Sequence, residues 1–353
     1  MPRDVRHIPV MLRPVLDVLR PRPGDVLVDC TLGLGGHTAA LAARVGPTGR
    51  VIATDFDPNN IALARGRLEA LGARVTTHPH DISPRLEPIV SDLGDLNKPG
   101  QSARALPEAP PRIRPHPDSD RALAPVDLFN TNFAALPAVL RDANVHRIHG
   151  LLADVGVAST QIDDPARGFS YRKPGPLDMR MDPSRGQPAS ALLARLSERE
   201  LAQAFLELGD ETDAPEIARL IVARRTQHPI LTTQDLTAIV CEARDFTLAR
   251  AAGAKLHPAA RTFQALRILV NRELANLERL LTVLPDVLAP GGVAAIISFH
   301  SGEDRIVKRA LRDGERAGLY SETSPDPLTA DDREIRENPR SRSAKLRWAR
   351  RAT

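Results

Sequence analysis

One stretch near the start of the chain decides the fold, Asp25-Val-Leu-Val-Asp-Cys-Thr-Leu-Gly-Leu-Gly-Gly-His37. Its apolar first half predicts a buried strand over 25–30, and a helix is expected over about 37–45. The glycines between them predict a tight turn, which lets a ligand approach the backbone closely and directs the helix amides at that ligand. A turn that only packs the strand against the helix is the alternative.

The alternation of strands and helices continues on both sides of this stretch. Helices are expected from Pro58 and over 133–143. Short apolar runs predict further buried strands over 50–55, 74–78, 147–155 and 291–301. Strands that alternate with helices predict an α/β domain built on a parallel sheet.

A proline-rich, charged segment over 92–127 interrupts this pattern. It has few aliphatic residues, so it cannot bury enough surface to offset the entropy of ordering it. We therefore predict a disordered insertion over these residues.

A second interruption is helical. It follows a glycine- and proline-rich stretch over 156–188, and it includes Ser197 and Glu200 at the spacing of a capping box. One long helix is then expected over 262–284, before the pattern returns to a strand. These patterns predict a discontinuous α/β domain over 1–163 and 262–353, interrupted by an all-helical domain over 164–261.

Composition limits the classes of protein. The 353 residues are 42% hydrophobic and 26% charged, which is ordinary for a globular chain. Cys30 and Cys241 lie far apart, which is typical of a reducing compartment and argues against a cysteine-rich metal site, so no metal is expected. No run approaches the roughly 18 apolar residues of a membrane helix. We expect a cytoplasmic protein with no membrane partner.

The basic residues are mostly arginine. Of the 48 lysines and arginines only five are lysine, although the net charge is a modest +4. Arginine makes bidentate contacts with phosphate and stacks on bases, which would favour a nucleic-acid partner. A GC-rich genome, which replaces lysine by arginine throughout, is the simpler explanation of the bias.

Two features narrow the ligand of the glycine turn. Asp55 ends the second strand, where a carboxylate can accept both hydroxyls of a ribose. Dehydrogenases and class I methyltransferases share this pair of features. The turn lacks the third glycine of the dinucleotide fingerprint, which favours an adenosyl ligand without a pyrophosphate.

Asp154 follows the strand over 147–155, at the edge where open α/β sheets bind their ligands. An acidic residue at this position can orient an amine nucleophile, and a solvated strand end is the alternative. His300 is a candidate base, but a single histidine without a visible partner is more often structural.

The chain resembles the RsmH (MraW) family of bacterial 16S ribosomal RNA cytosine-N4 methyltransferases. The resemblance covers nearly the whole chain in order. Its motifs are His7-Ile-Pro-Val-Met-Leu12, Gly35-Gly-His37, Asp55-Phe-Asp-Pro58, Asn132-Phe133, Asp154-Val-Gly156, Gln161, Arg167-Gly-Phe169, Gly175-Pro-Leu-Asp-Met-Arg-Met-Asp182, Arg261-Thr-Phe-Gln-Ala-Leu-Arg267, Ile297-Ser-Phe-His-Ser301, Glu303-Asp-Arg305 and Asn338-Pro-Arg-Ser-Arg-Ser-Ala-Lys345.

The resemblance implies a class I, Rossmann-like fold, S-adenosylmethionine as cofactor, and methylation of N4 of a cytidine in the decoding centre of the small ribosomal subunit. The cofactor-binding positions that it implies are Gly35, Gly36, His37, Asp55, Phe133, Asp154 and Gln161. We expect Asp154 to orient the amine as well. The chain departs from the family at Ala158, Thr160, Ala260 and Gly302, which leaves these positions intact but puts fine loop geometry in doubt.

The target base must leave its stack to reach such a site, so a stacking or phosphate-binding surface is needed. Phe169 and Tyr171 are candidates for stacking on the base. Candidates for holding RNA phosphates are Arg180, Arg261, Arg305, Arg340 and Arg342.

Two other functions remain open at this point. One is a non-catalytic RNA-binding factor in ribosome assembly, and the other is a nucleotide-dependent dehydrogenase. The expected partner is 16S rRNA or the small ribosomal subunit, and the sequence leaves open whether the protein forms a homodimer.

Overall fold

The computed structural model describes residues 9–78, 122–254 and 256–353. The chain divides into two compact units, unit 1 over Met1–Val155 and Asn276–Thr353 and unit 2 over Gly156–Ala275. The sequence places the corresponding boundaries at 163–164 and 261–262. Most of the disordered insertion predicted over 92–127 lies outside the described residues.

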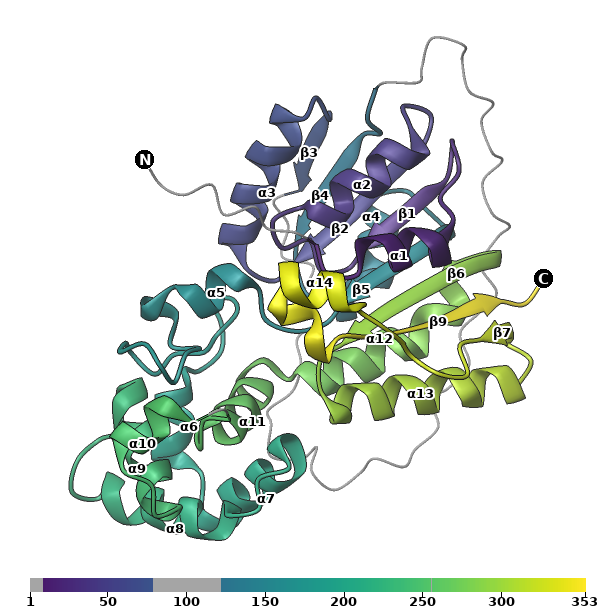
Figure 1. The fold of residues 1–353 in the computed structure, drawn as a ribbon. Helices are drawn as coiled ribbons and strands as arrows, with labels where there is room; N and C mark the ends of the chain where they lie inside the picture. The colour runs from purple at the N-terminus through teal and green to yellow at the C-terminus, as the bar shows by residue number, and fades with distance from the viewer. Residues whose placement is uncertain (1–8, 79–121, 255) are drawn as a thin grey trace. The chain divides into compact units, whose positions relative to one another are not determined.

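Unit 1 is built on one twisted sheet (Figure 1). In the described part of the chain it has nine strands, in the order β3-β4-β2-β1-β5-β6-β9-β7, with β8 paired to β9. The first six in this order run parallel, and β9 is antiparallel to β6, β7 and β8. The strands are β1 (Val26–Asp29), β2 (Arg50–Asp55), β3 (Val75–His78), β4 (Val126–Asn130), β5 (Ile148–Asp154), β6 (Leu288–Ser298), β7 (Tyr320–Thr323), β8 (Leu328–Thr329) and β9 (Lys345–Arg351).

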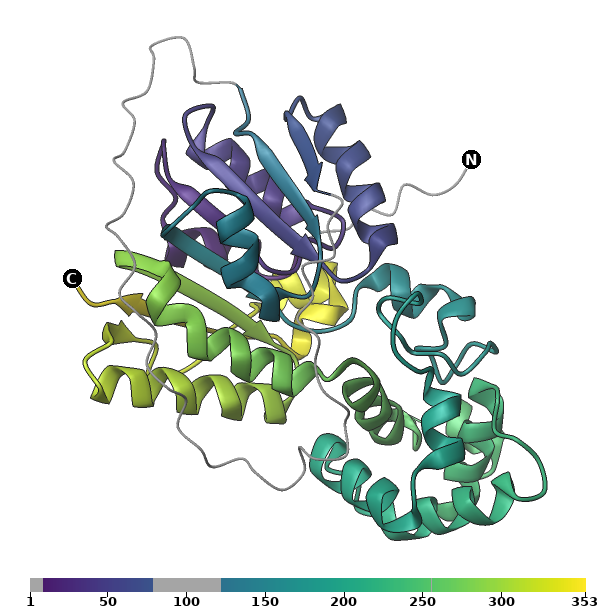
Figure 2. The ribbon, with the colours of Figure 1, turned by 180° about the vertical axis from the view of Figure 1, so that it is seen from behind.

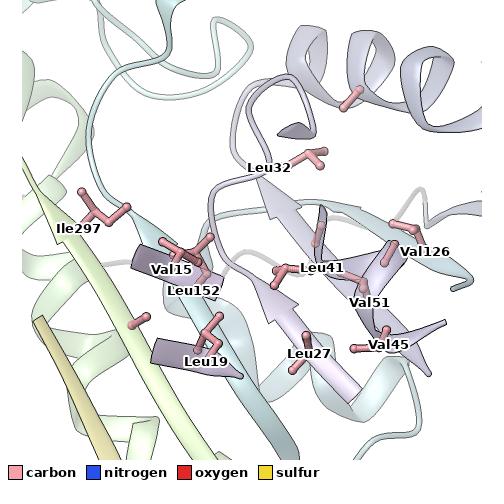
Figure 3. Close-up of a cluster of buried hydrophobic side chains, with 14 of the residues drawn as sticks. Val15, Leu19, Leu27, Leu32, Leu41, Val45, Val51, Val126, Leu152 and Ile297 are labelled. Carbon is pink, nitrogen blue, oxygen red and sulfur yellow. The ribbon is translucent and has the colours of Figure 1, made fainter. Parts of the chain in front are cut away.

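Helices cover both faces of this sheet because each inner strand buries side chains on both sides. One core joins the sheet to α1 (Leu12–Leu19), α2 (Gly36–Val45) and α3 (Pro58–Ala70), and Figure 3 shows part of it. The other core joins it to α4 (Leu136–Asp142), α12 (Glu273–Val287) and α13 (Ser301–Arg316). Figure 2 shows α4 and α12 from behind. Such two-sided burial explains why the parallel strands are short apolar runs.

The order of the strands places the topological switch point of the sheet beside β1. From β1 the chain passes to β2 on one side, and β5 pairs with β1 on the other. In open α/β sheets, ligands bind outside the carboxyl ends of the strands at such a switch point. The glycine turn and Asp154 follow β1 and β5, so both lie at this edge.

Unit 2 is helical, with its own core of buried side chains that includes Phe205, Ile217, Leu236 and Phe263. Ser197 and Glu200 form the predicted capping box at the start of α7 (Glu198–Gly209). The other elements of the unit are α5 (Ser159–Asp163), η3 (Pro165–Arg167), α6 (Ala189–Arg195), α8 (Ala214–Arg225), α9 (Thr233–Ala243), α10 (Leu248–Gly253) and α11 (Ala260–Asn271).

Two expectations about secondary structure were wrong, and the bounds of one expected strand differ from those in the structure. The helix expected over 262–284 is two helices, α11 and α12, because Arg272 between them has a left-handed backbone (φ 52°). Residues 126–127, placed in the disordered insertion, begin β4. The strand expected over 291–301 begins earlier, at Leu288, and ends at Ser298.

Candidate active site

The glycine turn after β1 is held by its own backbone and by β2. Gly33 and Gly35 have positive φ angles of 51° and 73°, which glycine adopts without strain. The Gly35 amide donates to the Leu32 carbonyl at 2.7 Å, and the Gly33 amide donates to Oδ2 of Asp55 at 2.8 Å. At Gly36, a Cβ would lie 2.5 Å from Cγ of Pro9, so any larger residue would displace the segment before α1.

Asp55 therefore has a structural contact as well as a candidate ligand. Its carboxylate also accepts from the Asp57 amide at 2.8 Å and from the Asn60 side chain at 3.2 Å. Burial raises the pKa of Asp55 to about 7, against the opposing effect of the hydrogen bonds from Asp57 and Gly33. The carboxylate is oriented at the end of β2, as the binding of a ribose requires.

Phe133 follows the neighbouring strand end. Asp55 is paired with Asn130 in the register of β2 and β4, and Phe133 begins the short 3₁₀ helix η2 (Phe133–Ala135) just beyond it. The Asn130 side chain donates to the carbonyls of Asp55 and Phe56 at 3.0 and 3.3 Å. This strand end therefore places a partly exposed aromatic ring beside the proposed ribose position.

A buried polar network links β1, α2 and β5. Asp29, which is fully buried, accepts from the Thr31 amide and from the Thr38 hydroxyl, at 3.1 and 2.7 Å. Thr31 Oγ1 in turn accepts from the Asp154 amide at 2.7 Å. The network fixes the backbone at Asp154 relative to the glycine turn.

His37, in the first turn of α2, faces Asp154. Its Nε2 lies 2.9 Å from the Val10 carbonyl, which can only accept, so Nε2 carries the proton. Nδ1 then faces Oδ2 of Asp154 at 3.9 Å. Burial lowers the pKa of His37, so the ring is neutral near pH 7.

Asp154 is the least satisfied carboxylate of this group. Among the described residues, its Oδ1 is one of seven buried side-chain atoms for which no hydrogen-bond partner is found. Burial, with smaller contributions from the neighbouring carboxylates of Asp29 and Glu303, raises the pKa of Asp154 to about 8. A buried acceptor without a partner at the switch point is what an absent donor, in the cofactor or the substrate, would satisfy.

His300 and Glu303 form a second group, at the end of β6. Glu303 is fully buried, and its Oε2 accepts from the amides of Phe299 and His300 at 2.8 and 3.3 Å. His300 is the N-cap of α13 and accepts from the Glu303 amide. Glu303 was given no role from the sequence beyond its place in a family motif, although a polar residue and a glutamate three residues apart before a helix are the signal of a capping box.

Gln161 belongs to unit 2, where it is buried in α5 and its Oε1 accepts from the Ala158 amide at 2.9 Å. Its sequence-predicted partners in the cofactor site belong to unit 1. Its side chain therefore has a local structural contact, and its expected contact with the methionine moiety stays a prediction.

The RNA candidates of unit 2 are mostly engaged within that unit. Phe169 is only 8% exposed and packs in the helical core, so its expected stacking on a base is corrected: the ring is not presented to solvent. Tyr171 stacks on His257 with ring centroids 4.5 Å apart. Arg180 pairs with both oxygens of Asp178, at 2.8 and 2.7 Å, and Arg261 donates to the Asp210 carbonyl.

The RNA candidates of unit 1 are more accessible. Arg305 on α13 is exposed, and so are Arg340 and Arg342 in the 3₁₀ helix η4 (Pro339–Ser343) that follows α14 (Asp332–Glu337). Asp304, beside Arg305, points to a different pair of cations, with Arg347 at 2.6 Å and Lys345 at 3.4 Å. The three arginines are thus placed on the surface, as phosphate contacts require.

The sheet and the site define a class of protein. The Rossmann-like sheet has a glycine turn after β1, the carboxylate of Asp55 at the end of β2, and the aromatic ring of Phe133 after the neighbouring strand β4. This is the arrangement of class I S-adenosylmethionine-dependent methyltransferases. The oriented carboxylate of Asp55 and the unpartnered Oδ1 of Asp154 fit the ribose hydroxyls and a donor group of that cofactor.

The comparison with known sequences gives the family. The profile of the MraW methylase family matches residues 4–97 and 91–352, so the chain belongs to that family. It is 42% identical to ribosomal RNA small subunit methyltransferase H of Sorangium cellulosum, over 99% of this chain and 92% of that protein. It is 40% identical to the protein of the same name from Acidobacterium capsulatum, over 98% of each. The predicted family is confirmed.

A solved rRNA methylase from Streptococcus thermophilus aligns with 97% of this chain and 94% of its own, at 10% identity and a TM-score of 0.38. That likeness is too low to add to the family assignment. None of the described helices is long and apolar enough to cross a membrane.

Proposed function

We propose that this protein methylates the exocyclic N4 amine of a cytidine in the decoding centre of 16S rRNA. The names of its relatives support a small-subunit rRNA substrate. Membership of a methylase family argues against the dehydrogenase alternative. The observation that carries the proposal is Asp154, whose buried Oδ1 lacks a partner at the switch point of the sheet.

The chemistry explains the need for such a carboxylate. The lone pair of an exocyclic cytosine amine is delocalised into the ring, so the amine is a poor nucleophile. S-adenosylmethionine supplies an activated methyl group. Asp154 would accept a hydrogen bond from the amine and hold its lone pair in line with that methyl. The N–C bond forms as the S–C bond breaks, and an amine proton is then lost.

Other residues of unit 1 support this step. Thr31 fixes the backbone of Asp154, and His37 presents the bare Nδ1 of a neutral ring to Oδ2 of the same carboxylate. Gly35, Gly36, Asp55 and Phe133 would bind the adenosyl part of the cofactor.

We also infer that both units bind RNA. In unit 1, Arg305, Arg340 and Arg342 are exposed, and contacts with phosphate need exposed guanidinium groups. In unit 2, Tyr171 is partly exposed and stacked on His257, which gives it a fixed orientation for stacking on a base. Arg180 and Arg261 would contact phosphate only through nitrogens not used within the unit.

The experiment is transfer of a labelled methyl group to small subunits that lack the modification, followed by mass mapping of the nucleotide. We expect one N4-methylated cytidine, and a fall of about 100-fold or more in turnover for Asp154→Asn. Asp142→Asn, the same change at an exposed position on α4, is the matched control. A non-catalytic assembly factor would transfer no label, and a methylated position other than N4 would refute the proposed chemistry.

A further inference from the structure

The search outside the cofactor turn leads to the end of β6. Three of the seven described buried atoms without a hydrogen-bond partner gather in this part of unit 1: Oδ1 of Asp154, Nε2 of His300 and Oε1 of Glu303. Asp154 and Ile297 are paired in the register of β5 and β6, and His300 follows three residues later. Glu303 is close enough to raise the pKa of Asp154 by its charge. Unsatisfied buried atoms in native structures are rare, and a group of them indicates a ligand.

The donor and acceptor character of these atoms can be assigned. The Glu303 amide can only donate, and it donates to Nδ1 of His300 at 3.4 Å. Nδ1 therefore carries a lone pair, and the proton of the neutral ring is on Nε2. Nε2 lies 3.2 Å from Oε1 of Glu303, but the two atoms are not aligned for a hydrogen bond. His300 thus has a buried N–H donor for which no hydrogen-bond partner is found among the described residues.

We propose that Nε2–H of His300 donates to N3 of the target cytosine while Oδ1 of Asp154 accepts from its N4 amine. This assignment rests on the proposed function and deepens it, because it names a residue that selects the base. Enzymes that act on an unstacked base read its Watson–Crick edge by hydrogen bonds. Cytosine presents there an amine donor beside a ring-nitrogen acceptor, and the two protein atoms are the complementary acceptor and donor.

The pair has a defined selectivity. Uracil presents a carbonyl oxygen and an N–H at the same two positions, so both hydrogen bonds would become contacts between like groups. Guanine fails in the same way. Adenine has the same order of donor and acceptor as cytosine, so its exclusion depends on its size and not on His300. A hydrogen bond from Nε2–H to N3 would also keep the N4 amine in position to donate to Asp154.

Glu303 acts in this arrangement as a positioning residue. It is fully buried, it accepts the amides of Phe299 and His300, and its other oxygen lies beside Nε2. The Glu303 carboxylate holds the backbone of His300, and the Glu303 amide holds its ring through Nδ1. The capping of α13 therefore also sets the direction of the N–H that faces the base.

The test removes the proposed hydrogen bond from each side in turn. Small subunits are reconstituted around 16S rRNA ligated from a synthetic segment, which carries either cytidine or 3-deazacytidine at the target, where a C–H replaces N3. Wild type and His300→Leu are compared on both substrates by kcat/KM. The His300→Gln variant keeps an N–H donor at the place of Nε2. The matched control is His146→Leu, the same change at an exposed site before β5.

We expect His300→Leu to lower kcat/KM on cytidine by roughly 10- to 100-fold, with partial rescue by His300→Gln. Wild type should lose a similar factor on 3-deazacytidine. On 3-deazacytidine, the kcat/KM of His300→Leu should be less than about twofold below that of wild type, because the hydrogen bond is already absent. The control should follow wild type on both substrates.

Equal losses for His300→Leu on both substrates would overturn the assignment, since a lost helix cap affects the two substrates alike. So would a wild-type enzyme that is indifferent to 3-deazacytidine. If wild type fails to methylate N4 of the unmodified cytidine, the proposed function itself fails, and this outcome is distinct from the other two.

Discussion

The cofactor side of unit 1 and the RNA candidates of unit 2 differ in what their side chains already contact. Asp55 is oriented by backbone amides, and Asp154 keeps one buried oxygen without a partner. Phe169 is in a hydrophobic core, and Arg180 is paired in a bidentate ion pair. The comparison teaches that a ligand site is better recognised by an oriented group with spare hydrogen-bonding capacity than by residue type alone.

The largest expected effect concerns Phe169. If it is a core residue, Phe169→Ala should lower the free energy of unfolding of unit 2 by about 3–5 kcal/mol. Denaturant unfolding followed by circular dichroism measures this loss. Phe246→Ala, at a partly exposed ring of the same unit, should cost clearly less. A variant of normal stability with weakened RNA binding would instead restore Phe169 to the RNA surface.

Replacing Asp55 should lower ligand affinity, whereas replacing Phe169 lowers stability. Asp55→Ala removes the proposed acceptor for the ribose and the acceptor of the Gly33 amide. Hydrogen bonds to a charged group contribute about 1.5–3 kcal/mol, so affinity for S-adenosylhomocysteine should fall by roughly 10- to 150-fold. Calorimetric titration at pH 8 measures it, with Asp142→Ala as the control. Unchanged affinity would separate this carboxylate from the cofactor site.

The stability of the ligand-free protein and its affinity for the cofactor should change with pH in opposite directions. The pKa values of Asp55 and Asp154 are raised to about 7 and about 8, above their ordinary values. Protonation of these groups therefore favours the folded ligand-free protein, and this contribution is lost as the pH rises through 7 and 8. Binding of the ribose needs ionised Asp55, so cofactor affinity should fall by up to about tenfold per unit below pH 7.

Thermal melting without ligand and calorimetry with S-adenosylhomocysteine, both from pH 6 to 9, measure these opposite trends. Asp55→Asn should remove most of the pH dependence of binding. Parallel trends for stability and affinity would show that the two carboxyls do not titrate as their burial implies.

The smallest effect is expected at the surface of unit 1. Replacing Arg340 and Arg342 together by glutamine should weaken RNA binding and make its salt dependence shallower by about 1.4 in the log–log slope. Affinity for the cofactor should not change. The same double change at Arg312 and Arg316, which are exposed on α13, is the control. A change in cofactor affinity alone would contradict the assignment to RNA.

The parts of unit 1 that could be predicted from the sequence are those where local pattern and tertiary environment agree. The strand over 50–55 is a run of apolar and β-branched residues that ends in Asp55, and the structure has β2 over the same residues. β4 was missed because Asp127 interrupts its short apolar pattern after a proline-rich segment. That carboxylate is satisfied by Arg50 and His78, at 2.7 and 2.9 Å, which are distant in sequence.

Arg272 and Phe169 show features that could not be predicted from the sequence pattern. A left-handed arginine between two amphipathic helices leaves no trace in the periodicity, so one helix was expected where α11 and α12 are separate. Phe169 lies among glycines and charged residues, which resembles a binding loop, but it is buried in a core built by helices that begin twenty or more residues later. Among the candidates for the site, Asp154 could be found from its strand end, but its unpartnered oxygen could not.

The contacts around the glycine turn also have a consequence for the order in which the protein matures during translation. Nε2–H of His37 donates to the Val10 carbonyl, and the next amide, that of Met11, donates to Glu334. The inner strand β9 is made last of all the strands. A nascent chain that has completed β1, α2 and β2 still lacks Glu334. The carboxylate of Glu334 holds Met11, in the segment that packs against the glycine turn. The turn gains its full set of contacts only when the C-terminal part of the chain has left the ribosome.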